Sequence, residues 1–279
     1  LPTILNKLGY TTTFMHGGVR ASMSFVAFSK KNGISRTFSL EEYEQERGKG
    51  DYDGSWGIWD HKFVDYAADK IIEMPKPLFT TIFSLSSHSP FKLPDDYSGE
   101  VVEGTMPIHK TIRYTDGVLR DFFAKLSREP FYDNTLFIIT ADHSSGGDSE
   151  KFRKVPHSFS IPIIFYKPNS TLKGEISEVA GHIDIMPTLV AALGYNEPYF
   201  GFGRDLFAQQ DSTTTPFTIN YFGGAFNIVT DSTTYLFNER DIISTIGAQR
   251  NDTTTQNRAK ALIQQYYTHI KNMNFLPRK

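Results

Sequence analysis

The chain has 279 residues, of which 39% are hydrophobic and 22% are charged, so its composition is that of a globular protein with a substantial core. Its formal net charge is −2, which gives no support to a nucleic-acid partner. Cysteine is absent, so disulfides and thiolate metal sites are excluded. No apolar run reaches the roughly 20 residues that a membrane-spanning helix needs.

Strand-like and helical segments alternate over the first two thirds of the chain. The strand-like segments are apolar almost throughout, and apolar residues between them recur at helical spacing. In chain order we predict a strand at Thr11–His16, a helix around Phe63–Ile72, a strand at Leu78–Leu85, a helix over Ile108–Leu126 and strands at Asn134–Thr140 and Ile161–Tyr166. This order favours the α/β class, with a mostly parallel central sheet and helices on both faces.

The pattern changes after Gly203. Before that point, Asp184 is predicted to cap a helix that ends at Gly194. After it, short strands indicate an antiparallel meander, and a final helix capped by Asp252 or Thr253 follows; the strands are Phe217–Phe222, Phe226–Thr230 and Thr234–Phe237. We therefore expect an α/β core at residues 1–207, lacking its N-terminal part, and a C-terminal part at residues 208–279 packed on it.

Three histidines directly follow strand-like runs. His16 precedes two glycines, His88 precedes Ser89 and Pro90, and His143 precedes a Ser-Ser-Gly-Gly run. If their strands lie parallel in one sheet, the three side chains emerge at the same edge, where polar sites of such sheets collect. Imidazoles gathered there suit a divalent metal or an anion such as phosphate or sulfate. For each histidine alone, a hydrogen-bonded structural role is the alternative.

The Asp142–His143 pair is the sharpest of these features. A carboxylate beside an imidazole at a strand end offers one oxygen ligand and one nitrogen ligand to the same ion. The alternative is a polar loop with no ligand. Weaker candidates are His157, His182 and Arg20, for which structural or solvated positions are the alternative.

No nucleophile stands out in the sequence. It contains no Gly-x-Ser-x-Gly elbow, no phosphate-cradling glycine loop and no His-Glu-x-x-His pair. A mechanism that uses only the residues present is therefore incomplete. The chain begins Leu1-Pro2-Thr3 without an initiator methionine, as if in the middle of a helix, and we expect it to be a piece of a longer protein.

The order of short motifs resembles the lipoteichoic acid synthases and related phosphoglycerol transferases of the sulfatase and alkaline-phosphatase superfamily. The matching segments run in family order from about residue 9 to residue 206: GYTTTFMHGG at 9–18, SWGIWD at 55–60, SLSSHSPF at 84–91, IRYTD at 112–116, NTLFIITADH at 134–143, HIDIMPTL at 182–189 and GRDL at 203–206. Each motif alone is moderately specific, whereas the ordered series is strongly specific.

This resemblance implies roles for four residues. Asp142 and His143 would be metal ligands, and His16 and His88 would contact the transferred phosphate or its glycerol. The metal would be Mn²⁺, with Zn²⁺, Mg²⁺ and Ca²⁺ as alternatives. The family's threonine nucleophile and a further acidic ligand would lie upstream of Leu1. At the places of the family's substrate-binding Trp and Arg, this chain has Met23 and Phe25.

The activity that the resemblance implies is phosphoglycerol transfer, or transfer of a related phospho-group. The donor would be a phospholipid head group, and the acceptor a glycan or lipid, at the outer face of a membrane to which missing N-terminal segments anchor the protein. One alternative is a hydrolase of the sulfatase or phosphodiesterase type on the same fold. Another is an inactive binding fragment, because half of the metal site is expected upstream.

Overall fold

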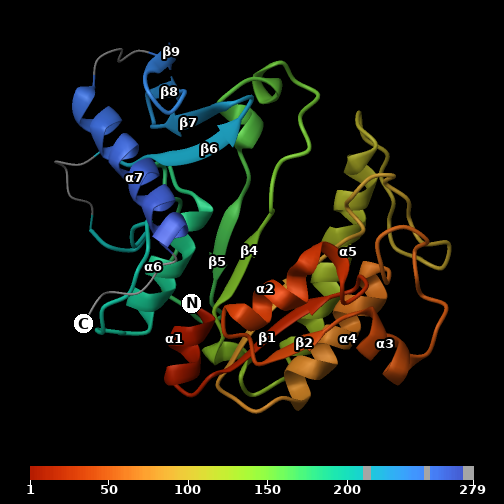
Figure 1. The fold of residues 1–279 in the computed structure, drawn as a ribbon. Coiled ribbons are helices and arrows are strands. Elements are labelled where there is room, and N and C mark those ends of the chain that lie inside the picture. Colours follow the sequence, from red (N-terminus) through yellow and green to blue (C-terminus); the bar gives the residue numbers. More distant parts are fainter. Residues whose placement is uncertain (210–214, 248–251, 273–279) are drawn as a thin grey trace. The chain divides into compact units, whose positions relative to one another are not determined.

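A computed structural model describes residues 1–209, 215–247 and 252–272 (Figure 1). They fall into two compact units. Unit 1 comprises Leu1–Leu136 with Lys167–Asn169, and unit 2 comprises Phe137–Tyr166 with the described residues after Asn169. The boundary expected between residues 207 and 208 lies within unit 2 and stays a prediction.

Unit 1 is built on a parallel sheet of three strands in the order β2-β1-β3. The central strand β1 is Thr11–His16, and its neighbours are β2 at Arg36–Phe38 and β3 at Leu78–Phe83. His16 lies opposite Phe83 in the register, so β1 and β3 end level with each other. Both strands that were expected here are confirmed, whereas the short strand β2 was not foreseen.

Helices cover both faces of this sheet (Figure 1). On one face, Phe14 of β1 contacts Phe25 of helix α2 (Phe25–Lys31), with ring centroids 5.7 Å apart. On the other face, Phe38 of β2 contacts Tyr66 of helix α4 (Asp60–Glu73), with ring centroids 6.2 Å apart. The α/β class is thereby confirmed. The helices of unit 1 are α1 at Pro2–Lys7, α2 at Phe25–Lys31, α3 at Leu40–Arg47, α4 at Asp60–Glu73 and α5 at Ile108–Leu126.

The amphipathic pattern of α4 predicted its buried face. Phe63, Tyr66, Ala67 and Ile71 are all buried, and the helix packs against β3 and α5. In α5 the prediction holds for the helix and its length but not for every side chain. The spacing of apolar residues predicts Ile112 on the buried face of this helix, yet Ile112 is 52% exposed. The buried stripe of α5 runs instead through Thr111, Tyr114, Val118, Phe122 and Leu126.

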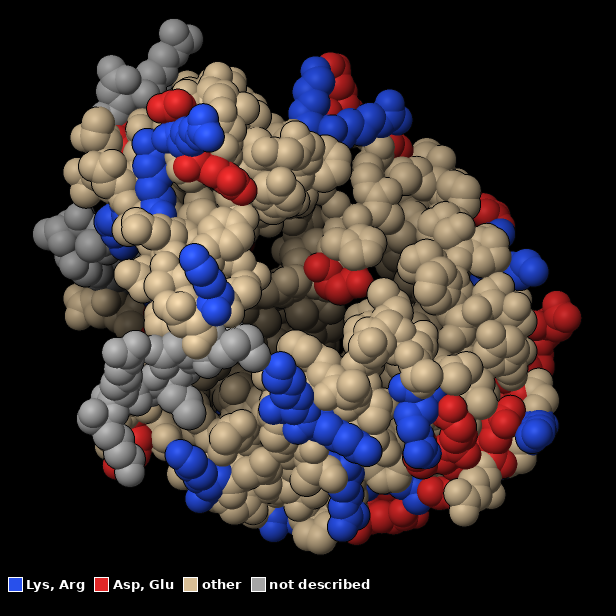
Figure 2. Space-filling model, viewed as in Figure 1, with Lys and Arg blue, Asp and Glu red and all other residues tan. Residues whose placement is uncertain are grey.

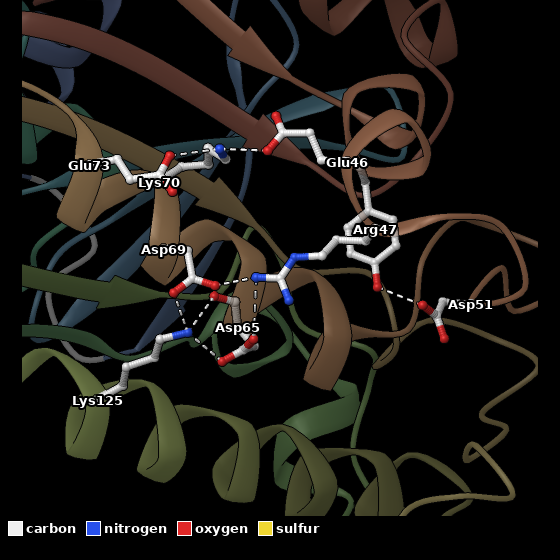
Figure 3. Close-up of polar contacts among 9 residues, drawn as sticks. Glu46, Arg47, Asp51, Asp65, Asp69, Lys70, Glu73 and Lys125 are labelled. Carbon is white, nitrogen blue, oxygen red and sulfur yellow. Dashed lines mark hydrogen bonds and ion pairs between the residues drawn. The ribbon is translucent and has the colours of Figure 1, made fainter.

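A charged network ties α3, α4 and α5 together (Figure 3). Lys125 of α5 lies 2.6 Å from Asp65 and 2.7 Å from Asp69, both on α4. Arg47 of α3 pairs with the same two carboxylates. Two cations thus share two anions, which fixes the three helices relative to one another on this side of unit 1.

Unit 2 begins with a pair of strands that run antiparallel. β4 at Phe137–Thr140 pairs with β5 at Ile163–Tyr166 in a sheet of two strands. We expected β4 and β5 to be parallel strands of the central sheet, and their antiparallel pairing shows that this expectation was wrong. Residues 141–162 contain only short 3₁₀ turns and no crossover helix, so the chain reverses direction instead of returning to start a parallel neighbour.

The C-terminal meander and helix are confirmed. β6 at Thr218–Phe222, β7 at Ala225–Val229, β8 at Thr233–Phe237 and β9 at Ile242–Gly247 form an antiparallel sheet in sequence order. Helix α7 at Thr253–Asn272 packs Ala259 and Ile263 into a core with Phe226, Ile228, Tyr235 and Phe237. Asp252 accepts the backbone N–H of Thr255 at 3.0 Å, so of the two expected caps it is the aspartate that acts.

Helix α6 at Ile185–Ala192 forms as expected, and Gly194 follows its end at a φ of 66°. The carboxylate of Asp184 does not cap this helix, however. It accepts the backbone N–H groups of Gly181 and Arg204, each at 2.8 Å. Asp184 therefore joins the start of the helix to the turn at 203–206.

Candidate functional site

His16, the last residue of β1, lies in an aromatic environment. Its side chain is buried, and neither ring nitrogen has a hydrogen-bond partner among the described residues. Phe25 meets the imidazole edge-on at 5.0 Å between centroids, and Phe83 does so at 5.8 Å. Burial lowers the pKa of His16, so the ring is neutral near pH 7. A buried imidazole with two unsatisfied nitrogens is costly unless a ligand or water meets them.

The two glycines after His16 allow close backbone packing. A Cβ on Gly18 would lie 2.6 Å from Nε2 of His16, and one on Gly57 would lie 2.4 Å from the carbonyl oxygen of Gly17. That carbonyl accepts the N–H of Ile58 at 2.9 Å. The turn after β1 and the SWGIWD segment therefore fit together only because both carry glycine.

Asp60 holds the loop that carries His88. This buried carboxylate accepts the N–H groups of Leu85 and Ser86, each at 2.9 Å, and the N–H of Asp60 donates to Oγ of Ser86 at 3.1 Å. Burial raises the pKa of Asp60 to about 6, and the hydrogen bonds oppose that rise. Asp60 is thus a positioning residue. The SWGIWD motif that ends on it did not reveal this role, because the hydrogen bonds run to residues 25 and 26 positions later.

His88 lies on this loop with an exposed side chain. Its Nδ1 is 3.0 Å from the carbonyl oxygen of Ser89, which can only accept, so Nδ1 carries the proton and Nε2 is left for a ligand. The indole of Trp56 packs on the imidazole at 3.9 Å between centroids and donates to the same carbonyl at 2.7 Å. Both the position and the tautomer of His88 are therefore set by its neighbours.

The strands that precede His16 and His88 are parallel neighbours, as predicted, so both histidines follow strand ends at the same edge of the sheet. His16 ends β1, and His88 follows the neighbouring strand β3. Among the residues aligned with the family's substrate-binding positions, Phe25 lies against His16, whereas Met23 is 71% exposed. Arg20 is engaged elsewhere, because its backbone N–H and its guanidinium bind Glu41 and Glu42.

Asp142 and His143 lie in unit 2, just after β4. Oδ1 of Asp142 accepts the N–H of His143 at 2.8 Å, and Nδ1 of His143 lies 2.7 Å from the carbonyl oxygen of Ser144. Nδ1 must therefore be the protonated nitrogen, which leaves the lone pair of Nε2 free, 3.6 Å from Oδ2 of Asp142. Both side chains are more than half exposed. This is the tautomer that a metal-binding histidine needs, so the pair fits a divalent ion as two of its ligands.

The end of β4 is held by His182. Its Nε2 lies 2.8 Å from the carbonyl oxygen of Ala141 and 3.3 Å from Oγ1 of Thr140. His182 thus supports the backbone that leads into Asp142. His157 is exposed, and its ring lies against Phe152. Within the described residues, no group of three or more histidine, aspartate or glutamate side chains is arranged to hold a metal.

The four predicted site residues divide between the units. His16 and His88 belong to unit 1, and Asp142 and His143 belong to unit 2. Their union in one site, and the metal and substrate roles assigned to them, stay predictions.

Comparison with known proteins gives the chain its relatives. The Sulfatase family model matches residues 1–195. The lipoteichoic acid synthase 1 of Bacillus subtilis is 26% identical over 240 residues, which cover 78% of this chain and 36% of that protein. The lipoteichoic acid synthase of Staphylococcus saprophyticus is 27% identical over 238 residues, with the same coverage. The chain thus spans about a third of the length of these relatives.

Solved structures with the same fold include the following two. A protein of the alkaline phosphatase superfamily from Vibrio parahaemolyticus superposes with a TM-score of 0.81 at 23% identity, covering 99% of this chain and 69% of that one. The lipoteichoic acid synthase LtaP from Listeria monocytogenes gives a TM-score of 0.81 at 19% identity, covering 100% and 74%. Among the described residues, no helix is long and apolar enough to cross a bilayer.

Proposed function

The chain belongs to the sulfatase family, and we propose that it is part of a metal-dependent enzyme that transfers phosphoglycerol, or a related phospho-group, from a phospholipid head group to a glycan or lipid acceptor. The observation that carries the proposal is His16, a buried imidazole at the end of β1 whose two nitrogens have no hydrogen-bond partner in the described part of the chain. The similarity to lipoteichoic acid synthases over 78% of the chain supports a phospho-group as the ligand.

In this proposal, Asp142 and His143 hold the divalent metal together with ligands from residues upstream of Leu1. The ion is Mn²⁺, with Zn²⁺, Mg²⁺ or Ca²⁺ as alternatives. When bound, it lowers the pKa of a coordinated hydroxyl and screens charge on the phosphoryl group. His143 is prepared for this role because Ser144 fixes its tautomer.

The histidines of unit 1 act on the phospho-group itself. His16, neutral and sealed by Phe25 and Phe83, donates one N–H to a non-bridging oxygen in a site with little competing water. His88 donates to a second oxygen through Nε2 in its doubly protonated form, in which Nδ1–H stays bound to the Ser89 carbonyl. Asp60 keeps the His88 loop in place, so that the two donors stay at a fixed separation.

The transfer then has two steps. The hydroxyl oxygen of a threonine upstream of Leu1 forms a bond to phosphorus, the bond from phosphorus to the diacylglycerol oxygen breaks, and the threonine proton ends on the released diacylglycerol. An acceptor hydroxyl next attacks phosphorus, and the threonine hydroxyl is restored with the acceptor's proton. The proposal locates both steps at the outer face of a cell membrane and makes the chain part of an extracytoplasmic domain.

The full-length protein, incubated with a fluorescent phosphatidylglycerol and Mn²⁺, tests the proposal. We expect release of fluorescent diacylglycerol, reduced about 10²–10³-fold by His16→Ala or His88→Ala, as is typical when one donor to a developing charge is removed. Arg120→Ala, an exposed change on α5, is the control and should act like wild type.

The second candidate is a hydrolase of sulfate esters or phosphodiesters, which the match to the Sulfatase family model favours. Hydrolysis of a sulfate ester without diacylglycerol release would replace the first proposal with this one. The residue at the nucleophile position also separates them, because cysteine or serine in a Pro-x-Arg context indicates a sulfatase and threonine a transferase.

A further inference from the structure

Helix α2 exposes a phenylalanine and buries the serine next to it. Phe28 is 68% exposed, whereas Ser29 is only 5% exposed. A helix at the surface of a protein normally does the reverse, because each apolar side chain that leaves water stabilises the fold. The exposed ring therefore gives the folded chain no benefit of its own and points to a partner that covers it.

The turn before α2 exposes a second large apolar side chain. Met23 is 71% exposed, and both Met23 and Ser24 have a left-handed backbone, with φ of 47° and 58°. This conformation is unfavourable for residues other than glycine and is typical of segments that serve a function. Val19, which is 45% exposed, precedes the turn. Residues 19–31 thus present several apolar side chains to solvent.

The charge of this part of the chain is positive. Every aspartate and glutamate of the sequence lies after residue 40, whereas the first 40 residues contain Lys7, Arg20, Lys30, Lys31 and Arg36. Lys30 and Lys31 are exposed in the last turn of α2, and they make no hydrogen bond or ion pair with any residue that the structure describes. Lys31 lies three positions after Phe28, so the two side chains are neighbours on the helix surface.

This combination fits the surface of an anionic lipid bilayer. A bilayer interface offers an apolar layer for side chains such as Phe28, and head-group phosphates above it for lysines. Lysine is depleted at interfaces between proteins, which argues against a second copy of this chain as the partner. Because the net charge of the chain is −2, the lysines act only at short range, and binding needs the apolar contacts as well.

We propose that Met23, Phe28, Lys30 and Lys31 form a docking face for a lipid bilayer with anionic head groups. The apolar pair enters the interface, and the lysines bind lipid phosphates. The inference rests on the proposed function for its purpose: Phe25 of the same helix packs edge-on against His16, so docking would hold the His16 site at the lipid surface. This face is distinct from the membrane anchor expected upstream of Leu1.

Cosedimentation of the 279-residue chain with lipid vesicles tests the docking face. We expect binding to vesicles of phosphatidylcholine mixed with phosphatidylserine. Binding to phosphatidylcholine alone should be at least about tenfold weaker, because each lysine near an anionic surface contributes roughly a factor of five. Phosphatidylserine replaces phosphatidylglycerol in this assay, so that recognition of a glycerol head group cannot account for the result.

Variants of the docking face separate its apolar and basic contacts. Phe28→Ser should weaken binding at least about tenfold, the effect of losing one large apolar contact. The double variant Lys30→Gln with Lys31→Gln should weaken it by a similar factor. All three side chains are exposed, so the fold should persist, which circular dichroism checks. The matched controls are Phe222→Ser, at a ring 66% exposed on β6, and Lys49→Gln, and both should bind like wild type.

Three outcomes overturn the inference. They are a lack of sedimentation with either kind of vesicle, equal binding of Phe28→Ser and wild type, and a dimer in analytical ultracentrifugation that Phe28→Ser abolishes. The last would make the face a contact between copies of the chain. The assay needs neither the metal nor the nucleophile. Vesicle binding without transfer would therefore keep the docking face and remove the proposed function, whereas transfer without vesicle binding would remove only the docking face.

Discussion

At the scale of single residues, the tautomer of His143 makes a specific prediction about metal binding. The carbonyl of Ser144 holds the proton on Nδ1, so Nε2 and the Asp142 carboxylate present two ligands, fewer than the four of a typical tight site. We expect the chain alone to bind Mn²⁺ weakly. Paramagnetic broadening of NMR signals should begin around Asp142 and His143 and disappear in Asp142→Ala, but not in Asp95→Ala. Tight, stoichiometric binding in a calorimeter that is lost in Asp142→Ala would contradict the expectation.

Asp60 makes a second prediction, about pH. Its pKa is raised from the ordinary 3.8 to about 6, so the folded protein holds this proton more firmly than the unfolded chain does. The stabilisation from the protonated form is complete below about pH 4 and is lost as pH rises through 6, by roughly 3 kcal/mol in all.

The variant Asp60→Asn has no titrating group at this position, so comparing it with the wild type isolates the pH-dependent stabilisation that comes from Asp60. The unfolding free energy of wild type minus that of the variant should fall between pH 4 and pH 6 and stay flat above. A ¹³C NMR titration of the Asp60 carboxyl in the wild type gives the same pKa directly and does not depend on how well the variant folds. A titration midpoint below pH 4 would contradict the prediction, because the two N–H donors would then lower the pKa of Asp60 by more than burial raises it.

At the scale of elements, the network on α3, α4 and α5 predicts a salt-dependent stability. Asp69 contacts both Arg47 and Lys125 (Figure 3). Asp69→Asn removes one of two shared anions, and we expect a loss of about 0.5–1 kcal/mol in urea unfolding that shrinks at high salt. Asp121→Asn, which breaks an exposed pair with Arg120 on α5, should change nothing measurable. An equal effect of the two variants would refute a role for the network.

The helices and strands also show which parts of the fold can be predicted from the sequence. β1, α4 and α5 were predictable because their apolar periodicity is strong and local. β2, α2 and α3 were missed because each is short, with at most eight residues, and too few turns or alternations to show a clear period. β4 and β5 run antiparallel because they pair with each other. The sequence within each strand does not specify which other strand it pairs with, so this direction was not predictable.

In the candidate site, too, some residues were predictable from the sequence and others were not. His16 and His88 were predictable because each follows an apolar strand, and the parallel order of β1 and β3 places them at one edge. The roles of Asp60 and Trp56 were not, because each acts through contacts with residues about 25 to 33 positions away in the sequence. Long-range contacts of this kind need the fold before they can be seen.

At the scale of the molecule, long-range charge does little to select a partner. The net charge is −2, and on the face in Figure 2 basic and acidic side chains intermingle. Attraction of a strongly charged partner would need a field of one sign. Recognition therefore has to come from local groups such as those around His88.

The division of the chain into two compact units predicts that the two units unfold separately. Unit 2 has its own core, in which Ile228 is fully buried against α7, whereas both tryptophans belong to unit 1. Ile228→Ala should cost about 2–5 kcal/mol by leaving a cavity. Because each unit has its own interior, Ile228→Ala should destabilise unit 2 more than unit 1. The unfolding transition of the variant seen by circular dichroism should therefore come earlier than in the wild type, whereas the transition seen by tryptophan emission should shift less. Ile243→Ala, on an exposed side chain of β9, should move neither signal. Equal shifts in both signals for Ile228→Ala would mean that the units unfold as one.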